Sequence, residues 1–387
     1  MVATTDYFVV EDLLSTEEKH IRDVVARFVR HTIFPQVGTL WLEGRFPREL
    51  VGQLANLGIF GATLPEKYGG SELSPIAYGL MMQELEYADS GLRSFASVQS
   101  GLAMYAIYRW GSEEQRLYWL PRMAQGEVIG CFGLTEPDAG SDPGSMRTRA
   151  RKTDQGWVLS GAKRWITNGS IAHVAIIWAR DEDDTIRGFI IPTDTSGFSA
   201  QDIKTKISMR MSVTSDLHLD DVVVPFENQL PLAEGLSAPL SCLTQARYGI
   251  AWGTVGAAQA CFDEALNYTS SRIVFSRAVS ATQLVQERLT DMISRIVHSQ
   301  LVAYRLGQLY QSGRLRYPQV SLAKRDNARN ALKVARMARE LLGGNGISVD
   351  YSAMRHLANL ETVDTYEGTY EIHTLIVGRD LTQIAAF

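Results

Sequence analysis

The sequence predicts a mainly α-helical protein in which a β-domain separates two helical domains. Three observations predict this order: a helix-start signal opens the chain, short β-rich runs crowd the middle, and long stretches without proline follow. The character of the sequence changes near residues 128 and 236. These changes divide the 387 residues into an N-terminal helical domain (1–127), a middle β-domain (128–235) and a C-terminal helical bundle (236–387).

The first helix is predicted to begin directly after Ser15. Ser15 and Glu18, three residues apart, fit a capping box, and apolar side chains recur behind them at positions 21, 24, 25 and 28. Ser112 and Gln115 repeat the capping signal further along the chain. Between the two signals, the Tyr-Gly-Gly at 68–70 indicates a loop.

The middle third is predicted to be β-structure. Turn-forming residues at 137–140, 154–156 and 181–184 separate its β-rich runs. Strands at such close spacing, with no helix between them, predict an antiparallel β-domain or barrel. The predicted strands are 128–134, 157–160, 164–167, 174–179, 189–192 and 216–224.

Long helices are predicted for the last third. The Gly-rich segment 343–346 is a helix stop, and long helices with short connections are typical of a bundle. The predicted helices are 246–270, 283–312, 320–342 and 370–380.

Composition excludes several classes of protein. A formal net charge of −5 argues against nucleic-acid binding through bulk charge. The cysteines, Cys131, Cys242 and Cys261, are too few and too far apart for a disulfide framework or a Cys-x-x-Cys metal site. The first residues lack the features of an export signal, and the apolar runs are strand-sized. We therefore expect no membrane insertion and a cytoplasmic location.

Common catalytic motifs are missing as well. The seven histidines form no HExxH, so a zinc hydrolase is not indicated and no metal site is predicted. Neither a G-x-S-x-G elbow nor a P-loop lysine occurs. The Gly-rich 343–346 follows a helix and not a strand, so it fails the context test for a dinucleotide-binding loop. Pattern alone predicts an α–β–α protein with a pocket where the layers meet.

Four segments carry a more specific signal. They are 134–142 (LTEPDAGSD), 165–167 (WIT), 341–346 (LLGGNG) and 365–369 (TYEGT). In this order and spacing they resemble the acyl-CoA dehydrogenase family of flavoenzymes, over nearly the whole chain. The resemblance implies bound FAD, an N-terminal helical domain, a middle β-domain, a C-terminal four-helix bundle and a homotetramer.

Within that family the sequence most resembles the glutaryl-CoA dehydrogenases. The decisive segment is 84–97 (ELEYADSGLRSFAS), and further support comes from 131–134 (CFGL), 246–252 (ARYGIAW) and Phe387. Dehydrogenases of plain fatty acyl chains need no cation at Arg93, whereas a substrate with a distal carboxylate does. A guanidinium can hold a carboxylate with two hydrogen bonds. Taken alone, Arg93 could equally form a surface salt bridge.

The resemblance assigns the catalytic base to Glu367. A carboxylate that flavin and substrate desolvate has a raised pKa and can take the proton α to a thioester. The Glu367 backbone N–H is expected to bond the thioester oxygen as charge develops. The remaining residues expected to bind substrate are Arg93, Ser94, Ser97, Ser141, Arg247, Gly368 and Glu86. Arg247 could bind a CoA phosphate or brace the bundle.

The resemblance also places FAD, which accepts the β-hydride because no side chain can. Gly343 and Gly344 would let the backbone approach its pyrophosphate, and they also fit a helix end. Arg272 and Gln283 match contacts to the FAD of a partner subunit. The residues expected to bind FAD are Phe132, Leu134, Thr135, Gly140, Ser141, Trp165, Ile166, Thr167, Arg272, Phe275, Gln283, Gly343, Gly344, Thr369 and Phe387.

Three alternatives remain open at the level of sequence. Glu-Gly-Thr-Tyr at 367–370 also occurs in short-chain acyl-CoA oxidases, and Tyr370 and Glu371 replace the His-Asp common in glutaryl enzymes. An acyl-carrier-protein dehydrogenase is the second alternative. The third is a flavin-poor, non-catalytic homologue, because Val274 and Ser276 depart from the family pattern, and Ser276 is strained if its φ is positive. The expected product of the glutaryl reaction is crotonyl-CoA after decarboxylation, and the expected electron acceptor is an electron-transfer flavoprotein.

Overall fold

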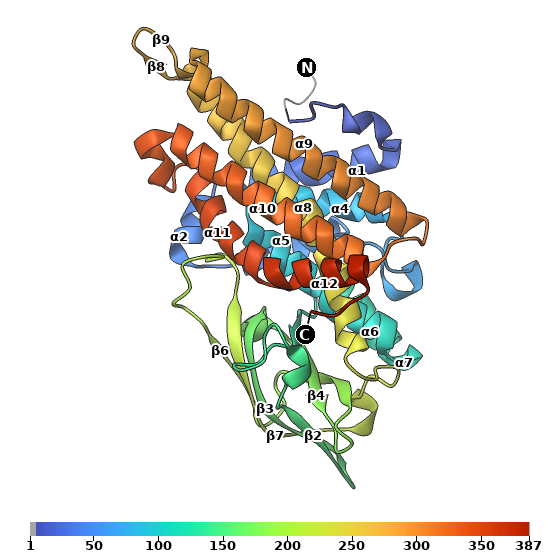
Figure 1. The fold of residues 1–387 in the computed structure, drawn as a ribbon. Helices are drawn as coiled ribbons and strands as arrows, with labels where there is room; N and C mark the ends of the chain where they lie inside the picture. The colour runs from blue at the N-terminus through green and yellow to red at the C-terminus, as the bar shows by residue number, and fades with distance from the viewer. Residues whose placement is uncertain (1–4, 387) are drawn as a thin grey trace.

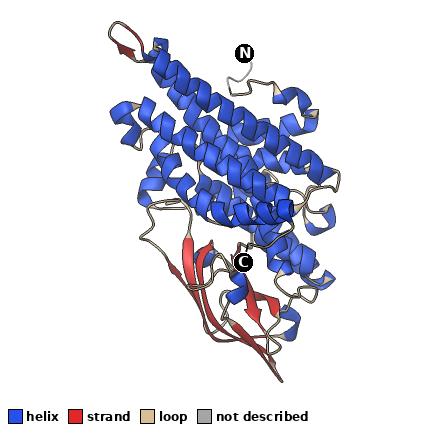
Figure 2. Cartoon of the chain, viewed as in Figure 1, coloured by secondary structure: helices blue, strands red, loops and turns tan. Residues whose placement is uncertain are grey.

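The computed structural model describes residues 5–386. Two helical domains pack against each other and the β-domain lies at one side of them, so the predicted α–β–α order is confirmed (Figures 1 and 2). One apolar core joins the two helical domains: Leu85 and Met104 belong to the same cluster as Trp252 and Leu306. The candidate site described below lies where these layers meet.

Short helices form the N-terminal domain. Both capping boxes are present: Ser15 and Ser112 each accept from the backbone N–H three residues on, and Glu18 and Gln115 return the bond. A π-helix at Val98–Met104 connects α5 to α6. The helices are α1 (Thr16–Phe28), α2 (Val37–Glu43), α3 (Val51–Asn56), α4 (Pro75–Ala88), α5 (Ser90–Ser97), α6 (Tyr105–Trp110) and α7 (Glu113–Ala124).

A curled seven-stranded sheet forms the middle domain. Its order is β1-β4-β2-β3-β7-β6, and β5 pairs with β4. Most pairs are antiparallel as predicted, but β1 runs parallel to β4, and β2 meets β4 in a short parallel bridge. The strands are β1 (Gly130–Gly133), β2 (Arg149–Thr153), β3 (Gly156–Thr167), β4 (Val174–Arg180), β5 (Ile186–Pro192), β6 (Phe198–Asp202) and β7 (Thr214–Val224).

One strand corrects the sequence prediction in a way that matters for the site. The runs 157–160 and 164–167 belong to a single strand, β3, whose register against β7 shifts between Lys163 and Ile166. Trp165 lies in this irregularity with φ +63°. A bulge redirects a side chain out of the alternating pattern, and the Trp165 side chain is 52% exposed.

Long helices form the C-terminal domain, with a small hairpin between the first two. α8 begins at Ser237, earlier than predicted, because Pro239 is tolerated in a first turn whose N–H groups need no partner. α11 was not predicted. The elements are α8 (Ser237–Ser271), β8 (Ile273–Val274), β9 (Arg277–Ala278), α9 (Gln283–Gln311), α10 (Tyr317–Leu341), α11 (Ala353–Thr365) and α12 (Tyr370–Thr382).

Glycines let α4 and α8 approach closely. A Cβ at Gly256 would lie 1.9 Å from the Gln83 carbonyl oxygen, and one at Gly253 would lie 2.1 Å from Oε2 of Glu86. These contacts bring the polar side of α4 against α8 with no room for a larger residue. Between residues 5 and 386, no helix combines the length and apolarity that crossing a bilayer requires.

Candidate active site

The deepest charged group of the site is an ion pair between α5 and α4. Arg93 is 0% exposed, and its Nε donates to Oε2 of Glu86 at 2.6 Å. α4 ends at Ala88 and α5 begins at Ser90, with the extended Asp89 between them, so the bend at Asp89 and not a helical period brings the two side chains together. Burial lowers the pKa of Arg93, but the charge of Glu86 and the contacts with Glu86 and Tyr366 together outweigh burial and raise it. Arg93 is therefore a permanent buried cation.

The Arg93 guanidinium also reaches the segment that carries the candidate base. Its Nη2 donates to the hydroxyl of Tyr366, the residue before Glu367. Its Nη1 is buried and has no hydrogen-bond partner among the described residues. The hydroxyls of Ser97 and Tyr78 are buried and unpaired in the same way. An unpaired buried donor is costly, so these groups form a buried cluster with unused hydrogen-bonding capacity.

Glu367 lies in the turn between α11 and α12. The turn is left-handed: φ is +51° at Glu367 and +100° at Gly368. A positive φ in a glutamate is uncommon and concentrates at functional sites. Oε2 of Glu367 is buried and accepts no hydrogen bond from the described residues. The carboxylate is therefore held apart from competing donors.

Burial raises the pKa of the Glu367 carboxyl group. The charges of Arg93, then Arg247, then Lys324 oppose this shift without cancelling it. A carboxylate with a raised pKa is a stronger base than an exposed one. This combination suits proton abstraction from a weak carbon acid.

Two buried cations hold the backbone of the Glu367 turn. Nε of Arg247, on α8, donates to the carbonyl oxygen of Glu367 at 2.6 Å. Nζ of Lys324, on α10, donates to the carbonyl oxygen of Gly368 at 2.8 Å. The bracing role is thus supported for Arg247, and its contact with a CoA phosphate stays a prediction. Sequence analysis missed Lys324, because only the fold brings it to this turn. It also gave no role to Tyr366, because the contact of Tyr366 with Arg93 depends on how α5 packs.

The other residues expected to bind substrate divide into buried and exposed ones. Ser94 and Ser97 are buried on α5 beside Arg93. A Cβ at Gly368 would lie 2.9 Å from Nε2 of His373, so this position has no room for a side chain. Ser141 lies exposed in the loop after β1, away from the buried cluster. Contact between Ser141 and CoA stays a prediction.

Residues expected at the flavin ring gather at the ends of β1 and β3. Phe132, Leu134 and Ile166 are buried in the protein core at these strand ends. The half-exposed hydroxyls of Thr135 and Thr167 make no hydrogen bond within the part of the chain that is described. Beside them the indole of Trp165 is exposed. Free hydroxyls beside an exposed aromatic face fit a flavin ring, which needs both stacking and hydrogen-bond donors.

A buried ion pair fixes the loop that carries Thr135. Nζ of Lys163 lies 2.8 Å from Oε1 of Glu136 and donates to the carbonyl oxygen of Leu134 at 3.2 Å. Glu136 also accepts from the backbone N–H and hydroxyl of Thr148. Sequence analysis missed Lys163. Gly140, in the same loop, is exposed, and a Cβ there would meet nothing within 4 Å.

A second set of predicted FAD residues lies at the opposite end of the bundle. Arg272, Phe275 and Gln283 surround the β8–β9 hairpin, which projects from the end of α8 and α9 in Figure 1. Phe275 is 95% exposed. Gly343 and Gly344 are exposed at the end of α10, and a Cβ on either would meet nothing within 4 Å. None of these residues contacts the Glu367 turn within this chain.

The hairpin turn bears out the strain expected at Ser276. Phe275 and Ser276 connect β8 and β9 as a two-residue loop, with φ of +50° and +66°. Two central residues of positive φ are typical of a type I′ turn, which glycine and asparagine favour. Thr369, another expected FAD residue, caps α12 by accepting from the N–H of Ile372. Phe387 lies outside the described residues.

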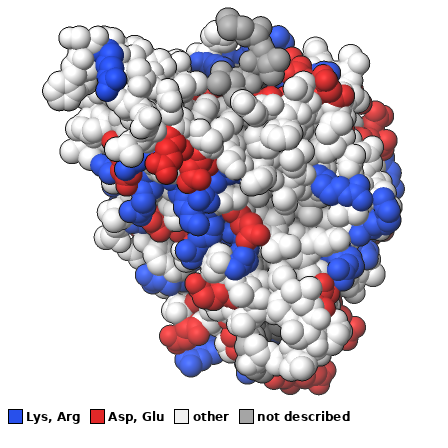
Figure 3. Space-filling view, turned by 45° about the horizontal axis from the view of Figure 1, so that its top comes forward, with Lys and Arg blue, Asp and Glu red and all other residues white. Residues whose placement is uncertain are grey.

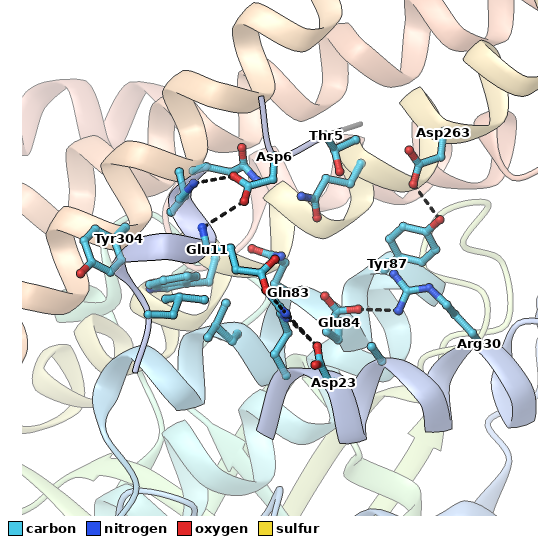
Figure 4. Close-up of a pocket in the computed structure, with 18 residues that line it drawn as sticks. Thr5, Asp6, Glu11, Asp23, Arg30, Gln83, Glu84, Tyr87, Asp263 and Tyr304 are labelled. Carbon is cyan, nitrogen blue, oxygen red and sulfur yellow. Dashed lines mark hydrogen bonds and ion pairs between the residues drawn. The ribbon is translucent and has the colours of Figure 1, made fainter. Parts of the chain in front are cut away.

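A pocket lies apart from these residues. It measures about 350 Å³ and lies between the N-terminal segment, α1, α4, α8 and α9 (Figure 4). Arg30 bonds Glu84 across it, and Tyr87 donates to Asp263. It contains none of the residues predicted to bind substrate or FAD. It therefore adds nothing to the chemistry of the Glu367 turn.

Charged side chains of both signs share the surface. On the face shown in Figure 3, acidic side chains lie beside the basic ones and no uniformly basic surface forms. Residues 5–386 contain no cluster of three His, Cys, Asp or Glu side chains that could hold a metal ion.

Comparisons with known proteins identify the fold. The chain matches three family models in order: "Acyl-CoA dehydrogenase, N-terminal domain" over residues 15–127, the middle domain over 131–222 and the C-terminal domain over 233–382. A Bacillus subtilis protein named acyl-CoA dehydrogenase is 31% identical over 373 residues, which cover 95% of this chain and 98% of that one.

Solved structures agree with these relatives. A glutaryl-CoA dehydrogenase from Mycobacterium smegmatis in complex with FADH2 is 49% identical, with a TM-score of 0.98 and full coverage of both chains. A glutaryl-coenzyme A dehydrogenase in complex with glutaryl-CoA is 31% identical, with a TM-score of 0.92 and 96% coverage of each chain.

Proposed function

This chain belongs to the acyl-CoA dehydrogenase family of FAD-dependent oxidoreductases, and we propose that its substrate is glutaryl-CoA. In this proposal Glu367 removes the α-proton and Arg93 binds the distal carboxylate. The similarity to glutaryl-CoA dehydrogenases supports the choice of substrate. The main observation in favour of glutaryl-CoA comes from the structure of this chain: the unpaired nitrogen of Arg93.

Arg93 suits a carboxylate because one of its guanidinium nitrogens has no hydrogen-bond partner among the described residues. Its Nε and Nη2 are taken by Glu86 and Tyr366, and Nη1 is buried without a partner. A neutral acyl tail would leave Nη1 unpaired, whereas a carboxylate would accept from it and from the free hydroxyl of Ser97. A charge-assisted hydrogen bond is worth roughly 1.5–3 kcal/mol. That is enough to favour a dicarboxylic thioester over a neutral one of equal length.

Glu367 suits the other end of the substrate. Its buried carboxylate, with Oε2 unpaired, can accept the α-proton of a thioester. This proton is acidic because its loss leaves an enolate. The backbone N–H of Glu367 is proposed to bond the thioester oxygen and so stabilise that enolate. Arg247 and Lys324 keep the carboxylate and the backbone N–H of Glu367 in place, because they hold the carbonyl oxygens of its turn.

The acceptor for the hydride of the β-carbon is supplied by FAD when it is bound. The residues proposed to hold the flavin ring are Thr135, Trp165 and Thr167, whose free hydroxyls and exposed indole fit it. The residues around the β8–β9 hairpin are proposed to hold the FAD of a second copy, since they lie apart from Glu367 in their own chain. A homotetramer and electron transfer to an electron-transfer flavoprotein are part of the proposal.

Decarboxylation is the proposed second step. Once the α,β double bond exists, the bond between the γ-carbon and the distal carboxylate can break, and its electron pair enters the conjugated thioester as a dienolate. Carbon dioxide leaves, and a proton added to the γ-carbon gives crotonyl-CoA. Glu367 carries the proton taken from the α-carbon and is the nearest acid to return it.

Tyr370 and Glu371 do not favour the oxidase alternative. Tyr370 is sandwiched by Arg325 and Arg329, whose guanidinium carbons lie 3.9 and 4.1 Å from the ring centroid. Glu371 is exposed on the same helix. Tyr370 thus contacts α10, Glu371 faces solvent, and neither makes a hydrogen bond to Arg93.

The test is anaerobic mixing of the FAD-loaded protein with glutaryl-CoA and, separately, with butyryl-CoA. Bleaching of the flavin absorbance with glutaryl-CoA alone, and recovery of crotonyl-CoA and carbon dioxide when an electron acceptor is added, is the expected result. Equal or faster bleaching with butyryl-CoA would remove Arg93 as a carboxylate ligand. Hydrogen peroxide production in air at the rate of bleaching would favour the oxidase.

A further inference from the structure

A buried lysine that no sequence motif points to lies behind the candidate base. Lys324, on α10, is 0% exposed. Its Nζ donates to the carbonyl oxygen of Asp364 at 3.2 Å and to that of Gly368 at 2.8 Å. Asp364 belongs to the last turn of α11, and Gly368 follows Glu367. Lys324 therefore joins the end of α11 to the turn that carries the base.

The two acceptors of Lys324 are backbone carbonyls and not a carboxylate. Buried lysines are normally neutralised by an acidic side chain at hydrogen-bond distance, yet the carboxylate of Asp364 pairs instead with Arg329 at 2.8 Å. The ammonium thus stays without a directly bonded counter-ion. An arrangement that retains an uncompensated buried cation requires a reason beyond stability.

The turn itself needs external support. Glu367 has φ +51°, a conformation that side chains with a Cβ rarely adopt. Its carbonyl oxygen is held by Arg247 and the next carbonyl oxygen by Lys324, so two consecutive carbonyls are fixed from α8 and α10. Without these donors the turn could relax and move the carboxylate of Glu367.

Lys324 also acts on Glu367 through its charge. Burial lowers the pKa of Lys324 to about 7, and the negative charges of Asp364 and Glu367 oppose that shift. The same pairing works on Glu367, whose raised pKa is pulled down in part by Lys324. Burial lowers the pKa of His373 to about 2, so its ring adds no charge. The groups facing this pair are Tyr78 on α4, Arg93 on α5, Arg247 on α8, Asp364 on α11, Tyr366 in the turn after α11, and His373 on α12.

We propose that Lys324 is a positioning residue for Glu367. It fixes the left-handed turn through the carbonyls of Asp364 and Gly368, and its ammonium charge keeps the Glu367 carboxylate ionised in neutral solution. Arg247 and Arg93 hold their charge at every working pH, so Lys324 is the one of the three that can lose its charge near neutrality. This inference rests on the proposed role of Glu367 as the base, and on no particular acyl group.

The first test needs no substrate. Infrared titration of the carboxyl band, with the Glu367→Gln protein subtracted, follows the protonation of Glu367 in the purified FAD-loaded enzyme. Lys324→Met should move this titration upward by about one pH unit, because a nearby positive charge is removed. Lys333→Met, an exposed position on the same helix, is the matched control and should move nothing. A titration unchanged in Lys324→Met would overturn the charge role.

A second variant separates positioning from charge. Lys324→Gln keeps two N–H donors for the carbonyls but carries no charge. It should hold FAD content and melting temperature near those of the unaltered protein while shifting the Glu367 titration as Lys324→Met does. If the methionine variant does not fold, the glutamine variant carries the same test. A glutamine variant that matches the unaltered protein in titration would show that Lys324 serves folding alone.

The kinetic test is the rate of flavin bleaching by acyl-CoA against pH. We expect the acid limb of the rate constant to move to higher pH in both Lys324 variants, with little change in the substrate concentration for half-maximal rate. An acid limb that stays at the pH of the unaltered protein in both variants would contradict the inference. Failure of the proposed function would give a different result. No acyl-CoA would bleach the flavin of the unaltered protein, while the infrared titration would still report the effect of the Lys324 charge on Glu367.

Discussion

The two ends of the proposed site are built in opposite ways. Around Glu367 every charged group is buried and contacts another element of the same chain: Arg93 pairs with Glu86, and Arg247 holds the turn. Around the β8–β9 hairpin the predicted FAD residues are exposed, with Phe275 at 95%. The acyl end is thus complete within one chain, and the hairpin end is not.

The difference indicates which part of the chemistry each end controls. A buried network of charged groups fixes distances and pKa values, so we expect the acyl end to decide which substrate reacts and at what pH. An exposed apolar tip is costly unless something covers it. We expect a second copy of the chain to cover the hairpin, so the hairpin end decides how well FAD is retained. The predictions below alter one end and examine the other.

The largest effect is expected from Glu367→Gln. A glutamine of the same shape cannot take a proton, so the rate of anaerobic flavin bleaching should fall by roughly 10²–10⁴-fold, the range typical of a lost general base. FAD content should stay unchanged, because the hairpin end is untouched. A variant that still bleaches within a factor of three of the unaltered protein would remove Glu367 as the base.

Phe275→Asp should break the hairpin end and spare the acyl end. Burial of a phenylalanine contributes about 1.5–3 kcal/mol, and an aspartate would bring a charge into the covered surface. We expect a shift to smaller oligomers by sedimentation and a loss of FAD affinity of about 10–100-fold. With FAD in excess, the preference for glutaryl-CoA over butyryl-CoA should persist. An unchanged oligomer and unchanged FAD content would show that the hairpin is not an interface.

The pH dependence should report the buried acyl end. The pKa of Glu367 is raised by burial, and the base works only when ionised, so activity is present above that pKa and is lost as pH falls through it. The bleaching rate should fall about tenfold per pH unit on the acid side. The fall should begin at a higher pH than an exposed glutamate would give. An acid limb at the ordinary glutamate position would contradict a desolvated base.

The smallest effect is expected from Ser276→Gly. Ser276 has φ +66° in a two-residue turn, and glycine adopts that conformation without the Cβ clash. Relief of this strain is worth about 1 kcal/mol. We expect tighter FAD retention, by about fivefold at most, measured by the rate of FAD loss on dilution. Weaker retention would show that the serine hydroxyl itself takes part in binding.

Local signals in the sequence predicted local structure well. Ser15 and Ser112 cap helices because a capping box needs only residues three apart. β3 was divided in two at residues 161–163, and the shifts in its register, one of them between Leu159 and Gly161, are visible only once β7 is in place. The helix α8 was shortened because its first turn contains Pro239.

The site was predictable only where a motif carries it. Glu367 and Arg93 were found through segments that resemble the family, and nothing in their spacing brings them together. The contacts that surround them join residues far apart in the chain, such as Arg93 with Tyr366 and Lys324 with Gly368. Such pairings depend on how α5, α10 and the turn before α12 pack, and single-sequence patterns do not specify that packing.

The most direct test of the central claim measures what Arg93 recognises. Anaerobic bleaching rates would be compared for glutaryl-CoA and pentanoyl-CoA, which have the same chain length but differ in the distal carboxylate. The unaltered protein would be measured beside a double variant, Arg93→Met with Glu86→Gln, which removes the cation without leaving a buried carboxylate unpaired.

The second-order rate constant for bleaching of the unaltered protein should be about 10–100-fold higher with glutaryl-CoA than with pentanoyl-CoA. This ratio is the equivalent of one charge-assisted hydrogen bond. The double variant should lose that preference and react at least as well with pentanoyl-CoA. A preference for glutaryl-CoA that survives in the double variant would contradict the assignment of Arg93 as the residue that binds the distal carboxylate.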